Sequence, residues 1–206
     1  MAMMLTAGIA GASAPVSPLS AIGTDPDATA AGAQPRAVSL NGRRHARAGR
    51  TVTLRGHVTP ASKRRVVVQV GGAKLGARTN EHGGFAVRWR APRAGVFTAR
   101  ARVADAPVRS DRFRINAYRP AAASYYGPGL YGNGLACGGT LTPSKIGVAN
   151  KSLPCGTRLT LRYGRRTVRV QVIDRGPFSG DREFDLTAAT RAKLGFPSTG
   201  TVLTTR

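Results

Sequence analysis

The sequence predicts a mainly β protein with an N-terminal β-sandwich over residues 36–118, followed by a small β-barrel with one or two short helices over residues 119–206. Short stretches of alternating apolar and polar residues, separated by turn residues, recur from about residue 36. After residue 118 the composition shifts to Gly and Tyr, and only "DLTAATRAKLGF" has helical features. With 206 residues and 41% hydrophobic content, the chain can bury a core in each domain.

The first domain contains five segments with the period of a β-strand, "TVTLRGHV", "RRVVVQV", "GFAVRWR", "GVFTARARV" and "RFRINAY". Their regular spacing and their turn-like connections favour an antiparallel sandwich of immunoglobulin-like type. Trp89, between two arginines, is expected in its core, with sugar stacking as the alternative. His57 and His82 have no Ser, Cys or carboxylate at motif spacing. We therefore expect a spacer or wall-binding module without a catalytic set.

The charge balance is strongly basic, with 32 Lys and Arg against nine Asp and Glu, a net charge of +23. Such a charge indicates a polyanionic neighbour but says nothing about the fold. The sequence has no helix-turn-helix pattern, no zinc spacing and no basic run interleaved with aromatic residues. Three readings stay open: a solvated cationic face, attraction to an anionic wall polymer, and specific nucleic-acid binding. We expect the wall polymer as the partner of the basic surface, and no specific nucleic acid.

Residues 1–35 combine a signal-like apolar segment, "MAMMLTAGIAGASAPVSP", with a linker rich in Pro, Ala, Gly, Ser and Asp. The apolar run ends in small residues, as a secretory signal does before its cleavage site. No Lys or Arg precedes it, so we expect the signal to be incomplete at its start; an Ala-rich tail is the alternative. The predicted location is secreted, in the cell wall, and no stretch is long enough to predict a transmembrane span.

Cys137 and Cys155 are the only cysteines, and 17 residues lie between them. An even cysteine count in an oxidising compartment favours a disulfide, with two buried thiols as the alternative. A bridge across such a loop would stabilise the fold by roughly 3 kcal/mol. The cysteines lack metal-ligand spacing, and we expect no metal and no organic cofactor.

The second domain begins after a junction at "YRPAAAS", residues 118–124, where a Pro and three Ala interrupt the pattern. Expected strands follow at residues 158–164, 166–174 and 201–205. The helix candidate has Asp185 or Thr187 as its N-cap and Gly195 as its C-cap. Few helices and short strands within about 85 residues indicate a small barrel.

All acidic residues between positions 121 and 206 lie in "VIDRGPFSGDREFDLT", residues 172–187. Asp174 ends an expected strand, and the following Arg-Gly-Pro turns the chain, so its carboxylate is expected at the barrel rim. It is our candidate general acid/base, and a turn-forming Asp that caps its own backbone is the alternative. Asp181 and Glu183 are expected to be solvated, with Arg182 paired to one of them.

Three segments, "ASYYGPGLYGNGLACGGTLT", "GVANKSLPCGTRLTLRY" and "VQVIDRGPFSGDREFDLTAATRAKLGF", resemble the rare lipoprotein A family. The resemblance covers residues 123 to about 204 and implies a six-stranded double-psi β-barrel related to those of expansins and barwin. It also implies a peptidoglycan lytic transglycosylase, which leaves a 1,6-anhydro sugar. Because the sugar's own 6-hydroxyl is then the nucleophile, one carboxylate can act first as acid and then as base.

The sequence departs from the family at two functional positions. The family's second acid corresponds to Gly139, and a groove His corresponds to Asn150. Asn150 keeps the ability to hydrogen-bond a sugar but does not titrate near neutral pH. Asp185 corresponds to an acid that expansins place across the groove, so it either orients substrate or caps the helix.

Three tyrosines in the uncharged Gly-rich run, Tyr125, Tyr126 and Tyr131, are candidates for stacking on sugar rings, with buried packing as the alternative for at least one. The first hypothesis is thus an exported protein whose barrel binds peptidoglycan glycan strands and cleaves them with Asp174. The second is an expansin-like protein that binds or loosens glycan without covalent chemistry, which the missing acid at Gly139 favours. The third is a barwin-type secreted inhibitor or defence module.

Overall fold

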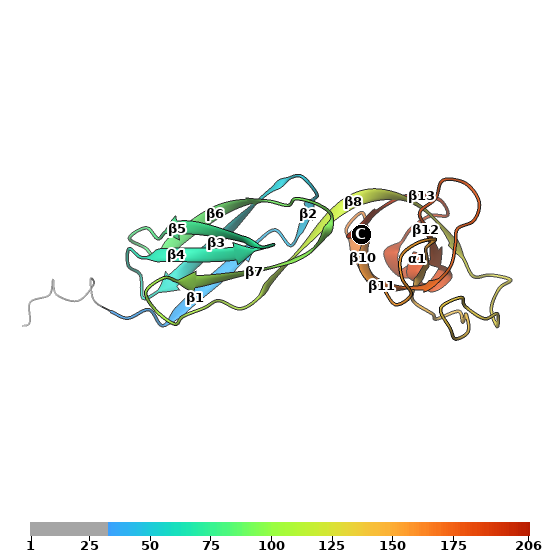
Figure 1. Cartoon of the computed structure of the whole chain (residues 1–206), viewed down its shortest axis with the longest axis horizontal. Helices are drawn as coiled ribbons and strands as arrows, with labels where there is room; N and C mark the ends of the chain where they lie inside the picture. The colour runs from blue at the N-terminus through green and yellow to red at the C-terminus, as the bar shows by residue number, and fades with distance from the viewer. Residues whose placement is uncertain (1–32) are drawn as a thin grey trace, which may run out of the picture.

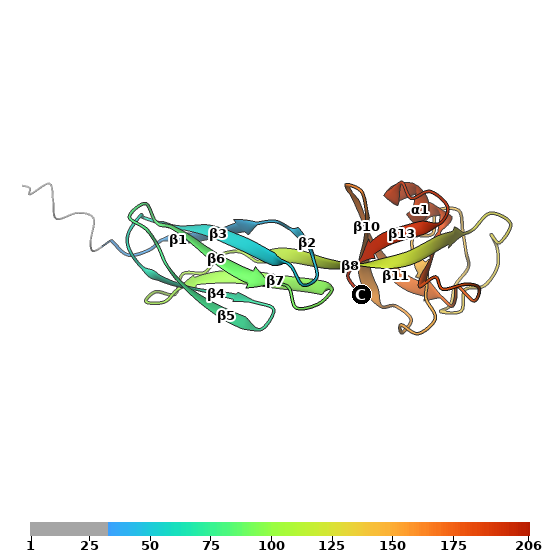
Figure 2. The same ribbon diagram turned by 90° about the horizontal axis from the view of Figure 1, so that it is seen from above.

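The structure is a computed structural model that describes residues 33–206. The predicted export signal and nearly all of the predicted linker lie outside these residues. The chain forms two β domains in line, each with its own hydrophobic core, and the long strand β8 passes from one to the other (Figure 1, Figure 2). Within the described part, no helix is both long and apolar enough to cross a membrane.

The N-terminal domain consists of two sheets. In the first, three antiparallel strands pair in the order β1 (Ala37–Gly42), β3 (Thr51–Thr59), β6 (Gly84–Arg90). In the second, the order is β5 (Ala73–Arg78), β4 (Arg65–Val70), β7 (Gly95–Val103) and the first half of β8 (Phe113–Tyr126). The short strand β2 (His45–Arg47) runs parallel to β8 on its other edge.

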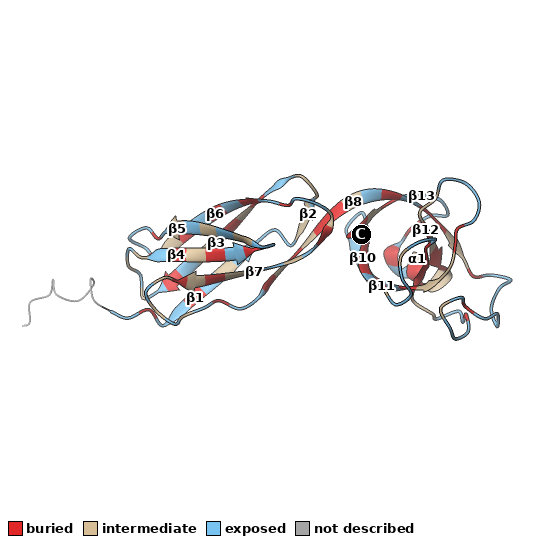
Figure 3. Ribbon diagram, in the orientation of Figure 1, coloured by how far each residue is buried: buried red, intermediate tan, exposed pale blue. Residues whose placement is uncertain are grey.

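The two sheets enclose one core, which follows from the alternation of side chains along each strand (Figure 3). In β4, Val66, Val68 and Val70 are buried, while the residues between them are not. Trp89 is 5% exposed and packs edge-on against Phe97, with ring centroids 4.9 Å apart. The expectation that this Trp packs in the core is confirmed, and the immunoglobulin-like class of the domain stays a prediction.

The second half of β8 and the five strands that follow close into a six-stranded barrel. These strands are β9 (Val148–Ala149), β10 (Arg158–Tyr163), β11 (Arg166–Asp174), β12 (Phe184–Thr187) and β13 (Gly200–Thr204). They pair in the order β8–β12–β9–β11–β10–β13, and β13 returns to β8. The predicted number of barrel strands is confirmed. The core inside is apolar and includes Phe184, Leu186 and Leu194, all fully buried.

One α-helix, α1 (Ala188–Leu194), occurs in the part of the chain that the structure describes. Thr187 is its N-cap and accepts a hydrogen bond from the Thr190 amide, and Gly195 is its C-cap with φ of 64°. Of the two predicted N-caps, Thr187 is therefore right and Asp185 is wrong. Asp185 lies two residues before this cap, in the middle of β12, and its carboxylate accepts a hydrogen bond from the Ser124 hydroxyl of β8 instead of from the helix.

The predicted domain junction lies inside β8 instead of in a loop. Residues 113–117 pair with β7, and residues 119–123 pair with β13 without interruption. Within the junction, Arg119 makes two hydrogen bonds to the carboxylate of Glu183, at 2.7 and 2.5 Å. The two domains are thus connected by a continuously paired strand.

Candidate functional site

The two acids singled out by the sequence flank the same residue of a neighbouring strand. Asp174 at the end of β11 and Asp185 in β12 are both register partners of Ala149 in β9, one on each side. The next partners, Val148 and Leu186, are fully buried in the barrel core. Because side chains alternate along a strand, Asp185, which precedes buried Leu186, lies on the face that points away from this core. Alternation alone would place Asp174 on the core side with Val172, but the register shifts between these two residues and brings Asp174 opposite Ala149.

The two oxygens of the Asp174 carboxylate have different environments. Oδ1 accepts hydrogen bonds from the backbone amides of Ala136 and Arg175, each at 2.9 Å. Oδ2 receives no hydrogen bond from residues 33–206, nor is it among their buried unpaired atoms. The first oxygen therefore holds the turn and a distant loop in place, and the second remains available to a ligand.

Strand β8 adds Ser124 and Tyr126 to the same face. Ser124 is the parallel register partner of Asp185, and its hydroxyl donates a hydrogen bond to that carboxylate. Asp174, Asp185, Ser124 and Tyr126 are called the acid cluster below. No sequence pattern predicts the role of Ser124, since this role depends on a parallel pairing between residues 61 positions apart.

The Tyr126 hydroxyl is buried and has no hydrogen-bond partner among the described residues. Burial raises the pKa of this phenol above its usual value, and the charges of Asp174 and Asp185 raise it further. Asp174 also acts on this pKa as a hydrogen-bond acceptor, although the hydroxyl and the carboxylate do not meet the geometry of a formed bond. Tyr126 is therefore a protonated, neutral phenol close to the two acids.

The other two tyrosines lie elsewhere. Tyr125 packs against the barrel core, and the guanidinium of Arg191 covers its ring at 4.3 Å from the centroid. Its ring is therefore not free for a sugar. Tyr131 is 40% exposed, and its hydroxyl lies close to the backbone of Gly127. Of the three, Tyr126 joins the acid cluster, Tyr131 offers an open ring, and Tyr125 has the packing role given as the alternative.

Asn150 is buried and its side chain is already bonded within the chain. Its amide nitrogen donates to the Glu183 carbonyl at 2.9 Å, and its oxygen accepts from the amides of Ser152 and Leu153. With 3% of its surface exposed, Asn150 stabilises the loop before β10 and does not offer this amide to a sugar. The predicted disulfide between Cys137 and Cys155 is confirmed.

Arg175, the second residue of "DRGPF", holds the same loop from the other side. Its guanidinium donates to the carbonyls of Asn150 and Leu153, at 3.1 and 2.9 Å, and contacts the sulfur of Cys155. The loop is therefore tied to the residue that follows Asp174 in the chain. Phe178 in the same motif is 83% exposed, a second open aromatic ring that sequence reasoning did not single out.

Gly139, the position of the family's second acid, lies in an exposed turn with φ of 80°. A Cβ at this position would lie 3.9 Å from the ammonium nitrogen of Lys145. The place of the family's acid is thus next to a cation, with a backbone conformation that favours glycine.

The prediction for the loop acids is partly wrong. Glu183 is not simply solvated but pairs with Arg119 of β8. Arg182 does not pair with an acid, since it donates to the backbone and side chain of Ser179. Asp181 is exposed as expected. The error arises because Glu183 is held beside β8 by its own amide, which donates to the Ala122 carbonyl at 2.9 Å.

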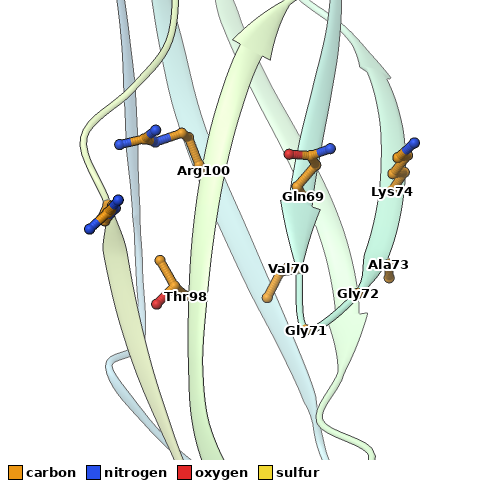
Figure 4. A pocket seen from close by; sticks show the side chains of 9 residues that line it. Gln69, Val70, Gly71, Gly72, Ala73, Lys74, Thr98 and Arg100 are labelled. Carbon is orange, nitrogen blue, oxygen red and sulfur yellow. The ribbon is translucent and has the colours of Figure 1, made fainter.

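Several hollows of the structure lie away from the acid cluster. One, of about 360 Å³, is formed by the β4–β5 hairpin and β7 of the N-terminal domain, with Gln69, Lys74 and Arg100 among its polar side chains (Figure 4). Others lie between the domains and are lined by arginines. Residues 33–206 contain no group of three or more His, Cys, Asp or Glu that could hold a metal ion.

The comparisons with known proteins agree with the barrel topology. The double-psi β-barrel model described as lytic transglycolase matches residues 121–205. Residues 121–205 belong to the rare lipoprotein A-like double-psi β-barrel family. This family barrel starts within β8, so the strand that ends the first domain also opens the second.

Relatives of the family barrel are similar to this chain at moderate identity. They include a probable endolytic peptidoglycan transglycosylase RlpA of Synechocystis, 37% identical over 42% of this chain, and an endolytic peptidoglycan transglycosylase RlpA of Pseudomonas aeruginosa, 41% identical over 38%. The chain spans 30% and 24% of these two relatives. A third, the endolytic peptidoglycan transglycosylase RlpA of Neisseria meningitidis, is 30% identical over 52% of this chain and 54% of the relative.

Among solved structures, the Streptomyces papain inhibitor is similar to part of the chain. It is 27% identical, and the match covers 43% of this chain and 94% of that one with a TM-score of 0.34.

Proposed function

We propose that the family barrel binds a glycan strand of peptidoglycan at the acid cluster and cleaves it as a lytic transglycosylase, with Asp174 as the general acid/base. The observation that carries this proposal is that the two oxygens of the Asp174 carboxylate differ in their hydrogen bonds. Oδ1 is fixed by two backbone amides, so the free Oδ2 has a defined direction. A catalytic carboxylate needs such a fixed position within reach of the proton that it transfers.

The proposed reaction uses one carboxyl group twice. Asp174, in its protonated form, gives its proton to the bridging glycosidic oxygen, and the bond from the anomeric carbon to that oxygen breaks with its electron pair on the oxygen. The 6-hydroxyl oxygen of the same sugar bonds to the anomeric carbon, and its proton returns to the Asp174 carboxylate. No water is consumed, one new 4-hydroxyl and one 1,6-anhydro end form, and Asp174 is regenerated.

The neighbours of Asp174 have supporting roles in this proposal. The Tyr126 hydroxyl, which has no other partner among the described residues, can donate to Asp174 when the latter is a carboxylate. Asp185, fixed through Oδ1 by Ser124, contacts sugar hydroxyls with its other oxygen. Tyr131 and Phe178 have exposed rings that are suited to stacking on sugars.

Export to the cell wall belongs to the same proposal. The disulfide between Cys137 and Cys155 supports it, because disulfides persist in oxidising compartments outside the cytoplasm. The similarity to relatives that are named peptidoglycan transglycosylases supports the same substrate class.

The reaction type can be tested by incubating the full oxidised chain with intact and with peptide-stripped peptidoglycan in water enriched in ¹⁸O. Mass spectrometry of the soluble products should show 1,6-anhydro ends without ¹⁸O at the cleavage site. Reducing ends that carry ¹⁸O would contradict the proposal, since they require water as the nucleophile. Products that are formed equally by the Asp174→Asn variant would also contradict it.

A non-catalytic, glycan-binding barrel is the second candidate, and two observations favour it. Gly139 supplies no second acid and lies next to the cation of Lys145, and Asn150 is buried in a structural role. In that case the same incubation releases nothing, while the chain still sediments with insoluble peptidoglycan. An Asp174→Asn change would then alter the affinity alone.

A further inference from the structure

Strand β8 is flanked by three adjoining clefts where the two domains meet, called the waist below. The first, of about 690 Å³, lies between the β2 region and the β10–β11 hairpin of the barrel. The second, of about 280 Å³, shares His45 with the first. The third, of about 630 Å³, shares Arg114, Thr160 and Arg169 with the second. Both domains contribute to every cleft, and neighbouring clefts share lining residues, so together they form a track beside the connecting strand. Figure 2 shows β8 passing from one domain to the other at this place.

Arginines dominate the walls of the waist, and no acidic residue lines any of its clefts. The first cleft is lined by four of them, Arg43, Arg47, Arg50 and Arg162. Only two ion pairs occur within residues 33–206, Lys63–Glu81 and Arg119–Glu183, and neither involves a waist arginine. The positive charge of the waist is therefore not neutralised by the described part of the chain.

Several of these side chains are held in place by neutral partners. The Nε of Arg162 donates to the Gly164 carbonyl at 2.9 Å, and the Nε of Arg114 donates to Asn116 at 3.3 Å. Arg44 lies over the ring of Phe113, 4.8 Å from its centroid. Each contact leaves the terminal nitrogens of the guanidinium free, so the donors are positioned in advance and remain available.

The crowding of like charges has an effect on two waist side chains. Burial lowers the pKa of His45, and the charges of Arg162 and Arg44 lower it further. Burial, followed by the charge of Arg169, lowers the pKa of Arg114. A bound anion would relieve this repulsion, which otherwise opposes the close approach of the two domains.

We propose that the waist binds the phosphate groups of a base-free phosphodiester polymer, such as a chain of polyol phosphates. Guanidinium groups match phosphate oxygens with two parallel hydrogen bonds, which makes phosphate the anion that arginine recognises best. A track of arginines over three adjoining clefts fits a chain of phosphates better than a single one. The site is distinct from the acid cluster, so it does not depend on whether the barrel cleaves glycan.

The aromatic residues of the waist argue against a nucleic acid as the occupant. Proteins that bind single strands stack bases on open aromatic faces. Tyr118 is 1% exposed, with His45 stacked on its ring. Tyr163 is 37% exposed and is packed edge-on against Phe196, with the ring centroids 5.3 Å apart. The clefts thus offer charge and hydrogen-bond donors with one partly exposed aromatic ring, which does not provide the row of rings on which successive bases stack.

The test is binding of the full oxidised chain to fluorescently labelled poly(glycerol phosphate), measured by anisotropy over a series of NaCl concentrations. Two double variants carry the same loss of charge. Arg47→Gln with Arg162→Gln removes one waist arginine from each domain. Arg55→Gln with Arg88→Gln removes two exposed arginines of β3 and β6 that line no cleft of the waist. Thermal unfolding confirms that both variants are folded.

We expect the waist variant to lose at least about tenfold in affinity and to reduce the slope of log K against log [NaCl] by about 1 for each arginine removed. The control variant should lose less than about threefold in affinity, since the charges that it removes lie away from the waist and are screened by salt. Equal losses in the two variants would overturn the proposal, because binding would then follow net charge alone. Unchanged binding in the waist variant would overturn it as well.

Two further probes test the chemical class of the occupant. A poly-glutamate chain of matched charge should bind more weakly than poly(glycerol phosphate), because the site is assigned to phosphate. A single-stranded oligonucleotide with the same number of phosphates should not bind more tightly. Tighter binding of either probe, lost in the waist variant, would replace the proposed occupant with a polycarboxylate or a nucleic acid.

Discussion

Asp174 and Asp185 face each other across Ala149, which is the register partner of both. With strands about 4.8 Å apart, their backbones lie roughly 10 Å from each other, and both carboxylates lie outside the barrel core. Tyr126 joins them from β8, and both acids raise the pKa of its hydroxyl. Asp174 and Asp185 lie close together in the sequence because β11 and β12 follow one another along the chain. The two strands flank the two-residue strand β9, so they bring both acids to the same place.

Tyr126→Phe removes a buried hydroxyl that has no partner among the described residues. Because such a group costs free energy in the fold, the free energy of unfolding should stay unchanged or rise by up to about 1 kcal/mol. If the hydroxyl orients Asp174, the rate of anhydro-product release should fall about tenfold, the value of one hydrogen bond to a charged group. Urea unfolding and product release are measured on the same preparation, and a variant that is both less stable and fully active would contradict this role.

The same phenol has a predictable effect on stability in alkali. Its pKa is raised in the folded chain, so its contribution is complete below the unfolded value of about 10 and declines as the pH rises above it. Urea unfolding between pH 9 and pH 11, approximate limits set by that unfolded value, should show falling stability. The fall should be shallower in Tyr126→Phe, and equal slopes for the two proteins would count against the raised pKa.

Reduction of the Cys137–Cys155 bridge should lower the free energy of unfolding by roughly 3 kcal/mol. The bridge also joins the loop whose Ala136 amide fixes Asp174 to the loop that Arg175 holds. Product release should therefore fall on reduction, at temperatures where the chain is still folded. Thermal unfolding and activity are compared with and without dithiothreitol, and a Cys137→Ser/Cys155→Ser variant should be insensitive to the reductant.

The pair between Arg119 and Glu183 should contribute measurably to stability, in contrast to the exposed pair of the first domain. Glu183→Gln should cost about 1 kcal/mol, because the contact is bidentate and partly shielded from water. The matched change Glu81→Gln, in a pair whose side chains are 71% and 75% exposed, should cost about 0 to 0.5 kcal/mol. Chemical denaturation measures the free energy of unfolding of both variants. Equal losses of free energy would show that Arg119 does not stabilise the junction.

His45 reports on occupancy of the waist. Its pKa in the free chain is lowered below the usual 6.5, so folding stability decreases as the pH falls from about 6.5 toward the folded pKa. The groups that face it are Tyr118 of β8, Arg162 of β10 and the neighbouring Arg44. Bound phosphate should raise this pKa, which NMR titration with and without poly(glycerol phosphate) measures. A pKa that does not move on saturation would contradict an anion beside His45.

Much of the fold could be predicted from local patterns. The alternation in β4, β6 and β7, the helix with Gly195 at its end and the strands β10 and β11 all follow from side-chain period and turn chemistry. Pro120 has no amide donor and therefore predicts a break, yet β8 continues because the residues on both sides of it pair with β13. Short strands such as β9 are too brief to carry a period.

The candidate site could be predicted only in part, for a related reason. Asp174 was identifiable because a strand and a sharp turn meet there, and the family words surround it. The place of Ser124 and the unpaired hydroxyl of Tyr126 depend on which strands become neighbours, since Ser124 meets Asp185 through parallel pairing of β8 and β12. Asn150 was expected to face a sugar, whereas its amide closes hydrogen bonds to Glu183, Ser152 and Leu153.

The most direct test of the account is the rate of release of 1,6-anhydro glycans from peptide-stripped peptidoglycan by the Asp174→Asn variant. Asparagine keeps an oxygen that can accept from Ala136 and Arg175, so the fold should be retained, while no proton can be transferred. We expect a loss of at least about 100-fold in rate with retained binding to the glycan, and no loss in the exposed control Asp181→Asn. A folded Asp174→Asn variant that releases anhydro glycans at the original rate would contradict the assignment of Asp174 as the general acid/base.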